Sequence, residues 1–177
     1  MVSSTNLFEL LLTKSILAIL DGDTDFGEIK PDDGSEPIRI SMPYLSGPNI
    51  CEISSIFGFP ASYDSQSRWV YMYDLIKHCI EKNKVYDLLT YLFSKKQYVE
   101  KLKGKTPALI DILHKKIIET VIQQINGILF FGGNELVTTG NNFQIKAINS
   151  SIVIADDNRK NSYSPAGKRQ YCQLPCT

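Results

Sequence analysis

The strongest constraint on the fold is a long series of apolar residues at helical spacing in the second half of the chain. Aliphatic side chains recur every three or four residues after Thr106-Pro107, at Ile110, Leu113, Ile117, Val121, Ile125 and Ile128. This period places them on one face of an α-helix, and Thr followed by Pro is a typical helix start. The pattern predicts a long helix from residue 106 to Gly127 or slightly beyond, with one face in a core.

The period of the apolar residues changes after this helix. Three short apolar segments are separated by clusters of Gly and Asn: Leu129–Phe131, Glu135–Thr138 and Phe143–Ile148. Such clusters between short apolar segments are typical of tight turns between antiparallel strands. We therefore expect short strands joined by turns, with Ser151–Ala155 as a further candidate strand.

Shorter helices are predicted upstream. Ser3–Asn6 offers N-cap side chains for a helix that continues to about Leu20, Ser46 opens a second helix that Gly58 ends, and a third begins at Ser65–Ser67. Its apolar side carries Trp69, Met72, Tyr73, Ile76 and Ile80. Asn83 ends this third helix, and a fourth runs from Val85 to about Phe93. Asp21–Pro37 is typical of a long acidic loop, and Ile38–Met42 alternates like a short strand.

These elements define the fold class and the domain organisation. The chain of 177 residues is 43% hydrophobic and 21% charged, which excludes a disordered protein and a membrane bundle. We predict a mainly α (α+β) fold, a helical domain with a small antiparallel β-hairpin near the C-terminus. Residues 1–155 form the single domain, and 156–177 are a polar, disordered tail or linker.

The compartment follows from the N-terminal segment and the cysteines. Glu9 and Lys14 interrupt Leu7–Leu20, so this segment is neither a signal peptide nor a membrane span. Four cysteines are few for this length, and buried free thiols in a reducing compartment explain Cys51 and Cys79. We predict a cytoplasmic protein without a membrane partner.

Charge is distributed unevenly along the chain. The 19 basic and 19 acidic residues cancel, but residues 1–37 hold eight acids against two bases, and residues 77–116 hold ten lysines against four acids. The lysine-rich part could therefore face an anionic partner although the whole chain attracts none.

The sequence offers little for catalysis. His78 and His114 are the only histidines, and neither a G-x-S-x-G elbow, an R-x-x-x-x-H motif nor a phosphate-binding loop is present. We therefore expect no enzyme activity, cofactor or metal site in this chain. Asp21-x-Asp23-x-Asp25 resembles half of a calcium loop, but Phe26 stands where the turn needs Gly. A solvated acidic loop is the simpler interpretation, and cation binding by these acids stays open.

Nucleic-acid binding is one alternative. Five lysines surround Tyr98 and could contact phosphates: Lys95, Lys96, Lys101, Lys103 and Lys105. Helices at 47–58 and 67–80 followed by a later hairpin have the order of a winged helix-turn-helix. In that arrangement Ser67, Arg68 and Tyr71 would begin the recognition helix. A solvated lysine-rich surface is the simpler interpretation.

Two stretches of the chain resemble a known family. The first is Tyr44–Ile53 through Phe57-Gly58-Phe59 and then Ser67–Tyr71, and the second is Ile125–Val137 followed by Phe143–Ile145. Over residues 40–148 they resemble the N-terminal accessory domain of bacterial abortive-infection (phage-defence) proteins. In the second stretch, Gly132 replaces the usual Asp and Asn134 the aromatic residue. The motif residues of the first stretch are Ser46, Gly47, Pro48, Arg68, Trp69 and Tyr71.

The resemblance implies a non-catalytic recognition or regulatory module with a sensing or protein-interaction role. Its partner would be another protein or a fused effector domain that is missing from this chain. The same residues have structural interpretations: Ser46 caps a helix, Arg68 pairs with Glu52 or Asp64, and Trp69 anchors the core. A further alternative is a small-ligand sensor with a pocket near Trp69 and Tyr44. The oligomeric state is not predicted.

Overall fold

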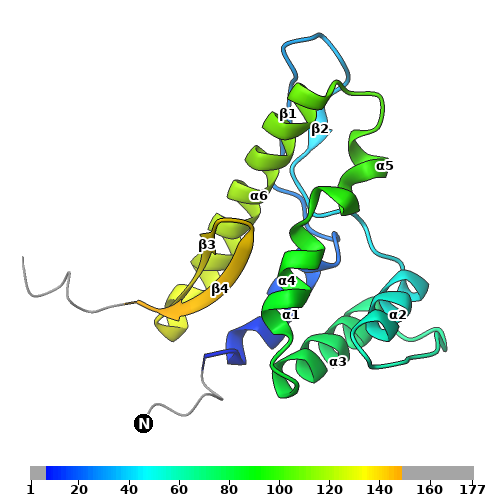
Figure 1. Cartoon of the computed structure of the whole chain (residues 1–177), viewed down its shortest axis with the longest axis vertical. Helices are drawn as coiled ribbons and strands as arrows, with labels where there is room; N and C mark the ends of the chain where they lie inside the picture. Colours follow the sequence, from blue (N-terminus) through cyan, green and yellow to red (C-terminus); the bar gives the residue numbers. More distant parts are fainter. Residues whose placement is uncertain (1–6, 149–177) are drawn as a thin grey trace, which may run out of the picture.

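The computed structural model describes residues 7–148, which form a mainly α fold with a small antiparallel hairpin close to the end of this range, as predicted. Figure 1 shows an elongated molecule with the longest helix along one side and the shorter helices beside it. Three predicted features lie outside the described residues: the N-cap at Ser3–Asn6, the strand at Ser151–Ala155 and the tail 156–177. Within residues 7–148, no helix is long and apolar enough to cross a membrane.

The longest helix, α6 (Pro107–Leu129), has the predicted bounds. The Thr106 hydroxyl accepts a hydrogen bond from the Leu109 N–H at 3.4 Å, and Pro107 needs no such acceptor because it lacks an N–H. The buried face of α6 carries four of the predicted aliphatic residues, Leu113, Ile117, Val121 and Ile125, together with Ile118 and Leu129. The other two predicted residues, Ile110 and Ile128, are half-buried. Each such side chain contributes about 1.5–3 kcal/mol on full burial, so this face holds α6 on the domain.

The hairpin pairs β3 (Asn134–Thr139) with β4 (Asn142–Ala147) in antiparallel register, with Leu136 opposite Ile145. It packs on α6 and on α4 (Val85–Phe93). Asn126 of α6 locks the register, because its side-chain oxygen accepts from the Leu136 N–H at 2.6 Å and its amide donates to the Leu136 carbonyl at 2.9 Å. In the chain, α4, α5 (Val99–Leu102) and α6 lie between α3 (Arg68–Glu81) and the hairpin. In space, the hairpin packs on α4 and α6. This arrangement therefore differs from that of a compact winged helix.

The prediction of a strand at Leu129–Phe131 is wrong. Leu129 still belongs to α6, and η3 (Phe130–Gly132) continues it as a 3-10 turn. The chain reverses at Gly133, whose φ of +69° is a left-handed conformation that glycine adopts without strain. The apolar sequence Leu129–Phe131 does not distinguish a helix end from a strand, because a short apolar segment fits both equally well.

The first predicted helix is interrupted. η1 (Glu9–Leu12) is a 3-10 helix, Thr13 is extended, and α1 (Lys14–Leu20) follows. The Thr13 hydroxyl donates to the Leu10 carbonyl at 2.8 Å, a local bond by which Thr competes with helix continuation.

α2 (Gly47–Ile56), α3 (Arg68–Glu81) and α4 begin and end close to the predicted residues. Asn83, with φ of +56°, separates α3 from α4. The buried face of α3 differs from the predicted one and consists of Tyr71, Met72, Leu75, Ile76 and Cys79. Trp69 is 40% exposed and is therefore not a core anchor.

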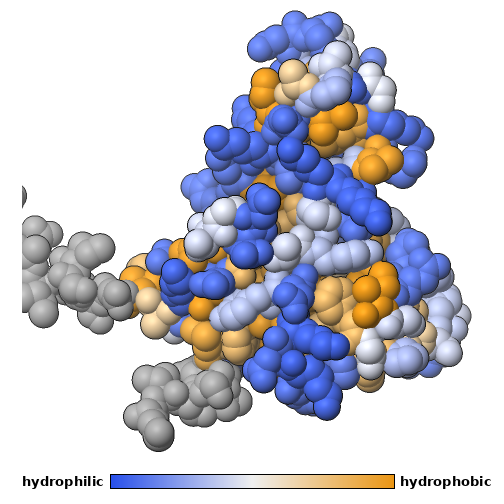
Figure 2. Space-filling view, in the orientation of Figure 1, coloured by the Kyte–Doolittle hydropathy of each residue, from blue (hydrophilic) through white to orange (hydrophobic). Residues whose placement is uncertain are grey.

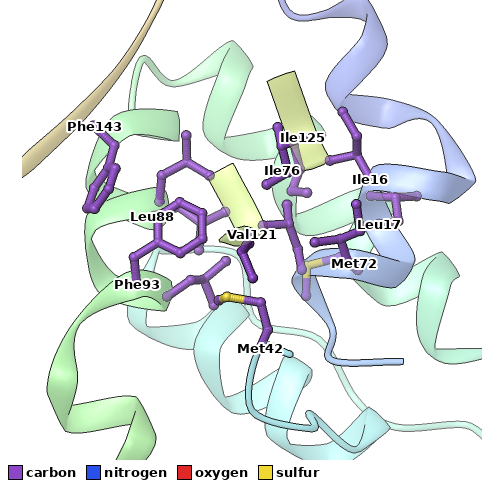
Figure 3. Close-up of a cluster of buried hydrophobic side chains, with 14 of the residues drawn as sticks. Ile16, Leu17, Met42, Met72, Ile76, Leu88, Phe93, Val121, Ile125 and Phe143 are labelled. Atoms are coloured by element: carbon purple, nitrogen blue, oxygen red, sulfur yellow. The ribbon is translucent and has the colours of Figure 1, made fainter. Parts of the chain in front are cut away.

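One hydrophobic core joins these helices (Figure 3). Ile16 and Leu17 of α1, Met72 of α3, Leu88 of α4 and Val121 of α6 converge in it without solvent exposure. Cys51 and Cys79 are buried free thiols, as predicted. Because the core draws on residues from α1 to β4, residues 7–148 pack as one unit.

The acidic loop and the lysine-rich segment lie at the other end of α6 from the hairpin (Figure 1). The loop is held by a two-stranded sheet of β1 (Glu28–Ile29) and β2 (Ile38–Arg39), so the predicted strand Ile38–Met42 is shorter than expected. The lysine-rich segment forms η2 (Lys95–Tyr98) and α5 (Val99–Leu102). The Tyr98 hydroxyl donates to Met42 Sδ at 3.1 Å and ties this segment to the loop before α2.

Candidate functional site

The side chain of Arg68 joins three segments that are far apart in the sequence. Its Nη1 donates to the carbonyls of Leu45 at 2.8 Å and Asp21 at 3.3 Å, and its Nη2 donates to Asp23 Oδ1 at 2.5 Å. The guanidinium carbon also lies 4.1 Å from the centre of the Tyr44 ring. We call Asp21, Asp23, Tyr44, Leu45 and Arg68 the Arg68 junction.

The junction corrects a predicted ion pair. Arg68 pairs with Asp23 and lies 3.8 Å from Asp21, not beside Glu52 or Asp64. Asp64 instead accepts a hydrogen bond from the Tyr71 hydroxyl, which lowers the pKa of Asp64, and that hydroxyl accepts from the Asp64 N–H at 2.9 Å. Tyr71 therefore fixes the segment before α3 and is buried, so it offers no surface to a nucleic acid.

The other motif residues shape the start of α2. Ser46 Oγ accepts from the Asn49 N–H at 3.3 Å, while the Asn49 side-chain oxygen accepts from the Ser46 N–H at 3.2 Å, which forms a reciprocal cap. Pro48 lies in the first turn. Gly47 packs under the Tyr63 ring so closely that a Cβ would lie 2.3 Å from it, which explains why glycine is needed.

A hollow of about 520 Å³ lies beside the junction. Tyr44, which is 66% exposed, and Trp69 both line it, together with Lys14 and Arg68. The Lys14 amine lies 4.4 Å from the centre of the Trp69 ring, at the distance of a cation–π contact. The structure therefore brings together Tyr44 and Trp69, the two aromatic residues that the sequence associates with a ligand pocket.

The charges of the junction compensate each other. Asp21 is almost fully buried, with 4% of its side chain exposed, and burial raises its pKa although the Arg68 charge lowers it. The Asp21 carboxylate also accepts from the Asp23 N–H at 3.1 Å. The Arg68 guanidinium contacts two carbonyls and two carboxylates. Its charge therefore serves to hold the fold together and is not available to a ligand.

The acidic triplet is not assembled as a metal site. Asp21 and Asp23 face Arg68, and Asp25 accepts from the Gly27 N–H at 3.4 Å. Within residues 7–148, no group of three His, Cys, Asp or Glu side chains is placed to hold a metal ion.

The five lysines of the nucleic-acid interpretation do not act as one set. Lys95 pairs with Asp111 at 2.6 Å, Lys103 pairs with Glu100 at 2.7 Å, and Lys101 donates to Ser41. Lys96 is exposed and Lys105 is half-buried, and neither has an ion pair within residues 7–148. A continuous phosphate-binding row of lysines is therefore not present in this part of the chain.

The two histidines lie apart and have structural partners. His78 stacks on Phe59 with ring centres 5.0 Å apart. His114 Nε2 lies 2.8 Å from the Phe93 carbonyl, an arrangement in which the Nε2–H donates, and burial lowers the pKa of this imidazole. Neither contacts a serine or cysteine side chain in the described structure, so neither activates a nucleophile there.

A second hollow, missed by the sequence analysis, lies between α2 and α5. It has a volume of about 790 Å³, and its walls include Arg39, Glu52, Tyr91 and Lys101, with Tyr44 shared with the first hollow. We call it the α2–α5 groove. Alternation in the short strand could have placed Arg39 on an exposed face, but no local pattern joins residue 39 to residue 101.

Comparison with protein-family models, curated proteins and solved structures finds no match. The structure unites the two separated parts of the first motif stretch, residues 44–48 and 67–71, at the Arg68 junction.

Proposed function

We propose that this chain is a non-catalytic recognition module of a bacterial defence protein of the abortive-infection type, and that it binds another protein or a fused effector domain. The observation that carries the proposal is the Arg68 junction. Arg68 contacts Tyr44 and Leu45 there, and Tyr44 and Trp69 are exposed beside one hollow. Tyr, Trp and Arg are the residues that dominate the binding energy of protein interfaces.

The rigidity of the junction supports this role. Arg68 ties the end of α1, the segment before α2 and the start of α3 through hydrogen bonds to Asp21, Leu45 and Asp23. The Ser46–Asn49 cap fixes the backbone next to Tyr44. Aromatic side chains on a fixed backbone lose little conformational entropy on binding, which favours affinity.

The surface around the junction also fits a protein partner. Figure 2 shows one face of the molecule, on which hydrophobic residues reach the surface in separate patches surrounded by hydrophilic ones; the surface at the junction itself is given by its lining residues. Tyr44 and Trp69 supply apolar area, while Lys14, Asp23 and Arg68 supply charge of both signs beside it. An apolar centre with a polar rim is the usual anatomy of a protein interface.

The experiment is a phage-infection assay with the complete native gene that contains this chain. The double variant Tyr44→Ser and Trp69→Ser should reduce protection at least about tenfold, because a lost hot spot costs 2 kcal/mol or more in binding. Ile112→Ser is the matched control, since Ile112 is an exposed apolar residue of α6 away from the junction. Protection equal to wild type by the double variant, at equal protein level, contradicts the proposal.

A second arm tests the absence of catalysis. The purified chain is incubated with RNA, DNA and nucleotides, and product formation is followed by chromatography. We expect no turnover. Turnover that disappears in His78→Asn or His114→Asn would overturn the non-catalytic assignment.

A further inference from the structure

The α2–α5 groove contains two cations that lack an acidic partner. Lys101 Nζ donates to Ser41 Oγ at 2.6 Å and to the Ser41 carbonyl at 2.8 Å, and both acceptors are neutral. Arg39 makes no side-chain hydrogen bond or ion pair to any residue from 7 to 148. Both line the groove, so their positive charge is directed at the same open space.

The electrostatics of Lys101 show that its charge is disfavoured in the folded protein. Burial is the main reason why the pKa of its amine is lowered to about 8; the Asp25 charge opposes this, and the Arg39 charge adds to it. A half-buried lysine beside an arginine favours an anion as third partner, because the anion stabilises both charges. Of the acids on the groove wall, Glu100 pairs with Lys103, and Glu52 makes no ion pair with Arg39 or Lys101 within residues 7–148.

The rest of the groove suits the organic part of a small ligand. Its volume of about 790 Å³ lies within the range of small-molecule sites. Tyr44 and Tyr91 bring aromatic surface to the walls, and Asn49 and Gln97 bring amide groups that can donate or accept hydrogen bonds. An aromatic base can stack on such rings while its edge bonds to amides.

We infer that the α2–α5 groove binds a nucleoside phosphate, with the phosphate between Arg39 and Lys101 and the base against the tyrosines. This site goes beyond the proposed protein-binding function: the two hollows share Tyr44, but neither Arg39 nor Lys101 lines the hollow beside the Arg68 junction, so variants of these two cations test the phosphate site separately. The phosphate supplies the missing anion, and Glu52 on the α2 wall can accept hydrogen bonds from ribose hydroxyls.

Isothermal titration calorimetry of the 177-residue chain tests this inference. The probes are adenosine monophosphate, guanosine monophosphate, adenosine and inorganic phosphate. At least one monophosphate should bind at least about tenfold more tightly than adenosine and than phosphate alone, since a charge-assisted hydrogen bond contributes about 1.5–3 kcal/mol. Equal affinities for adenosine and both monophosphates, or for phosphate and both monophosphates, would overturn the assignment.

Variants locate the phosphate. Arg39→Gln and Lys101→Gln should each weaken monophosphate binding about tenfold, while Lys96→Gln, an exposed lysine outside the groove, should not change it. Arg39→Gln is decisive, because the Arg39 side chain is exposed and makes no hydrogen bond or ion pair within residues 7–148, although Glu28 lies opposite it in the β1–β2 pair. Unchanged affinity in Arg39→Gln, or no binding of either monophosphate by the wild type at about 5 mM, overturns the inference.

Proton uptake gives an independent readout. A phosphate beside Lys101 raises the pKa of its amine above about 8, so binding at pH 8 should take up to about half a proton per site. Titrations in two buffers of different ionisation enthalpy measure this number. Uptake that persists in Lys101→Gln, or no uptake by the wild type, contradicts the placement of the phosphate at Lys101.

Discussion

Arg68 and Arg39 line two hollows that share Tyr44, but their environments are opposite. Arg68 contacts two carbonyls and two carboxylates, and only 19% of its side chain is exposed. Arg39 is exposed, contacts no acid within residues 7–148, and shares the α2–α5 groove with Lys101. Arg68, the arginine of the motif, therefore holds the fold together, whereas Arg39, which belongs to no motif, is free to bind a ligand.

The largest expected effect is on the free energy of unfolding, which should respond differently to substitution of the two arginines. Arg68→Met should lower the free energy of unfolding by about 3 kcal/mol, because it leaves the buried Asp21 carboxylate without its cation. Arg39→Met should change it by less than about 0.5 kcal/mol, as for other exposed surface residues. Urea denaturation of both variants measures the difference. Equal losses of unfolding free energy in the two variants would contradict the claim that Arg68 is structural and Arg39 is not.

Lys101→Met should give an intermediate loss. Its amine makes two hydrogen bonds to Ser41 that hold α5 to the loop after β2, and each is worth about 1 kcal/mol. The charged amine is costly to bury, which offsets part of that gain. We expect a loss of about 1 kcal/mol by urea denaturation at pH 7. A loss as large as that of Arg68→Met would mean that the groove is as structural as the junction.

The pH dependence of stability gives a further test of the buried Lys101 amine. The pKa of Lys101 is lowered to about 8 in the folded protein, from an ordinary value of 10.5. Between these values the unfolded chain binds more protons, so this amine's contribution to stability rises with pH. From about pH 7.5 to about pH 10, wild type should gain stability relative to Lys101→Met. A relative stability that stays flat or falls contradicts the lowered pKa.

The smallest effect belongs to the exposed pair Lys103–Glu100 on α5. Both side chains are largely exposed, so water and salt screen their attraction and the pair contributes little to stability. Lys103→Met should therefore leave the midpoint of urea denaturation almost unchanged, and should not shift it in about 1 M NaCl. A midpoint lowered as far as in Lys101→Met would show that the lysine-rich segment is stabilised by more than the contacts to Ser41 and Met42.

The helices could be predicted where their signals are local. Thr106-Pro107 starts α6, Ser46 starts α2, and Asn83 ends the α3 region, because caps and turn residues act within a few positions. The break at Thr13 and the 3-10 end at Phe130 escaped prediction. Each depends on a competing turn geometry that apolar periodicity does not encode.

The site was less accessible to sequence reasoning. Its motif residues were identified, but Arg68 was expected beside Glu52 or Asp64, within the same region of the chain. Its actual partners, Asp21 and Asp23, lie 47 and 45 positions away. The Ser41–Lys101 contact of the groove spans 60 positions. Tertiary packing alone brings such residues together, so composition and spacing could not distinguish an occupied arginine from a free one.

The most direct test of this contrast is a ¹³C NMR titration of the lysine side chains, observed at Cε from about pH 6 to about pH 12. Lys101 should titrate near pH 8, mainly because its amine is half-buried, with a smaller contribution from the Arg39 charge in the same groove. Lys103, beside Glu100, should titrate above the ordinary lysine pKa and serves as internal control. A Lys101 that titrates together with Lys103 would contradict a Lys101 charge that is disfavoured in the α2–α5 groove.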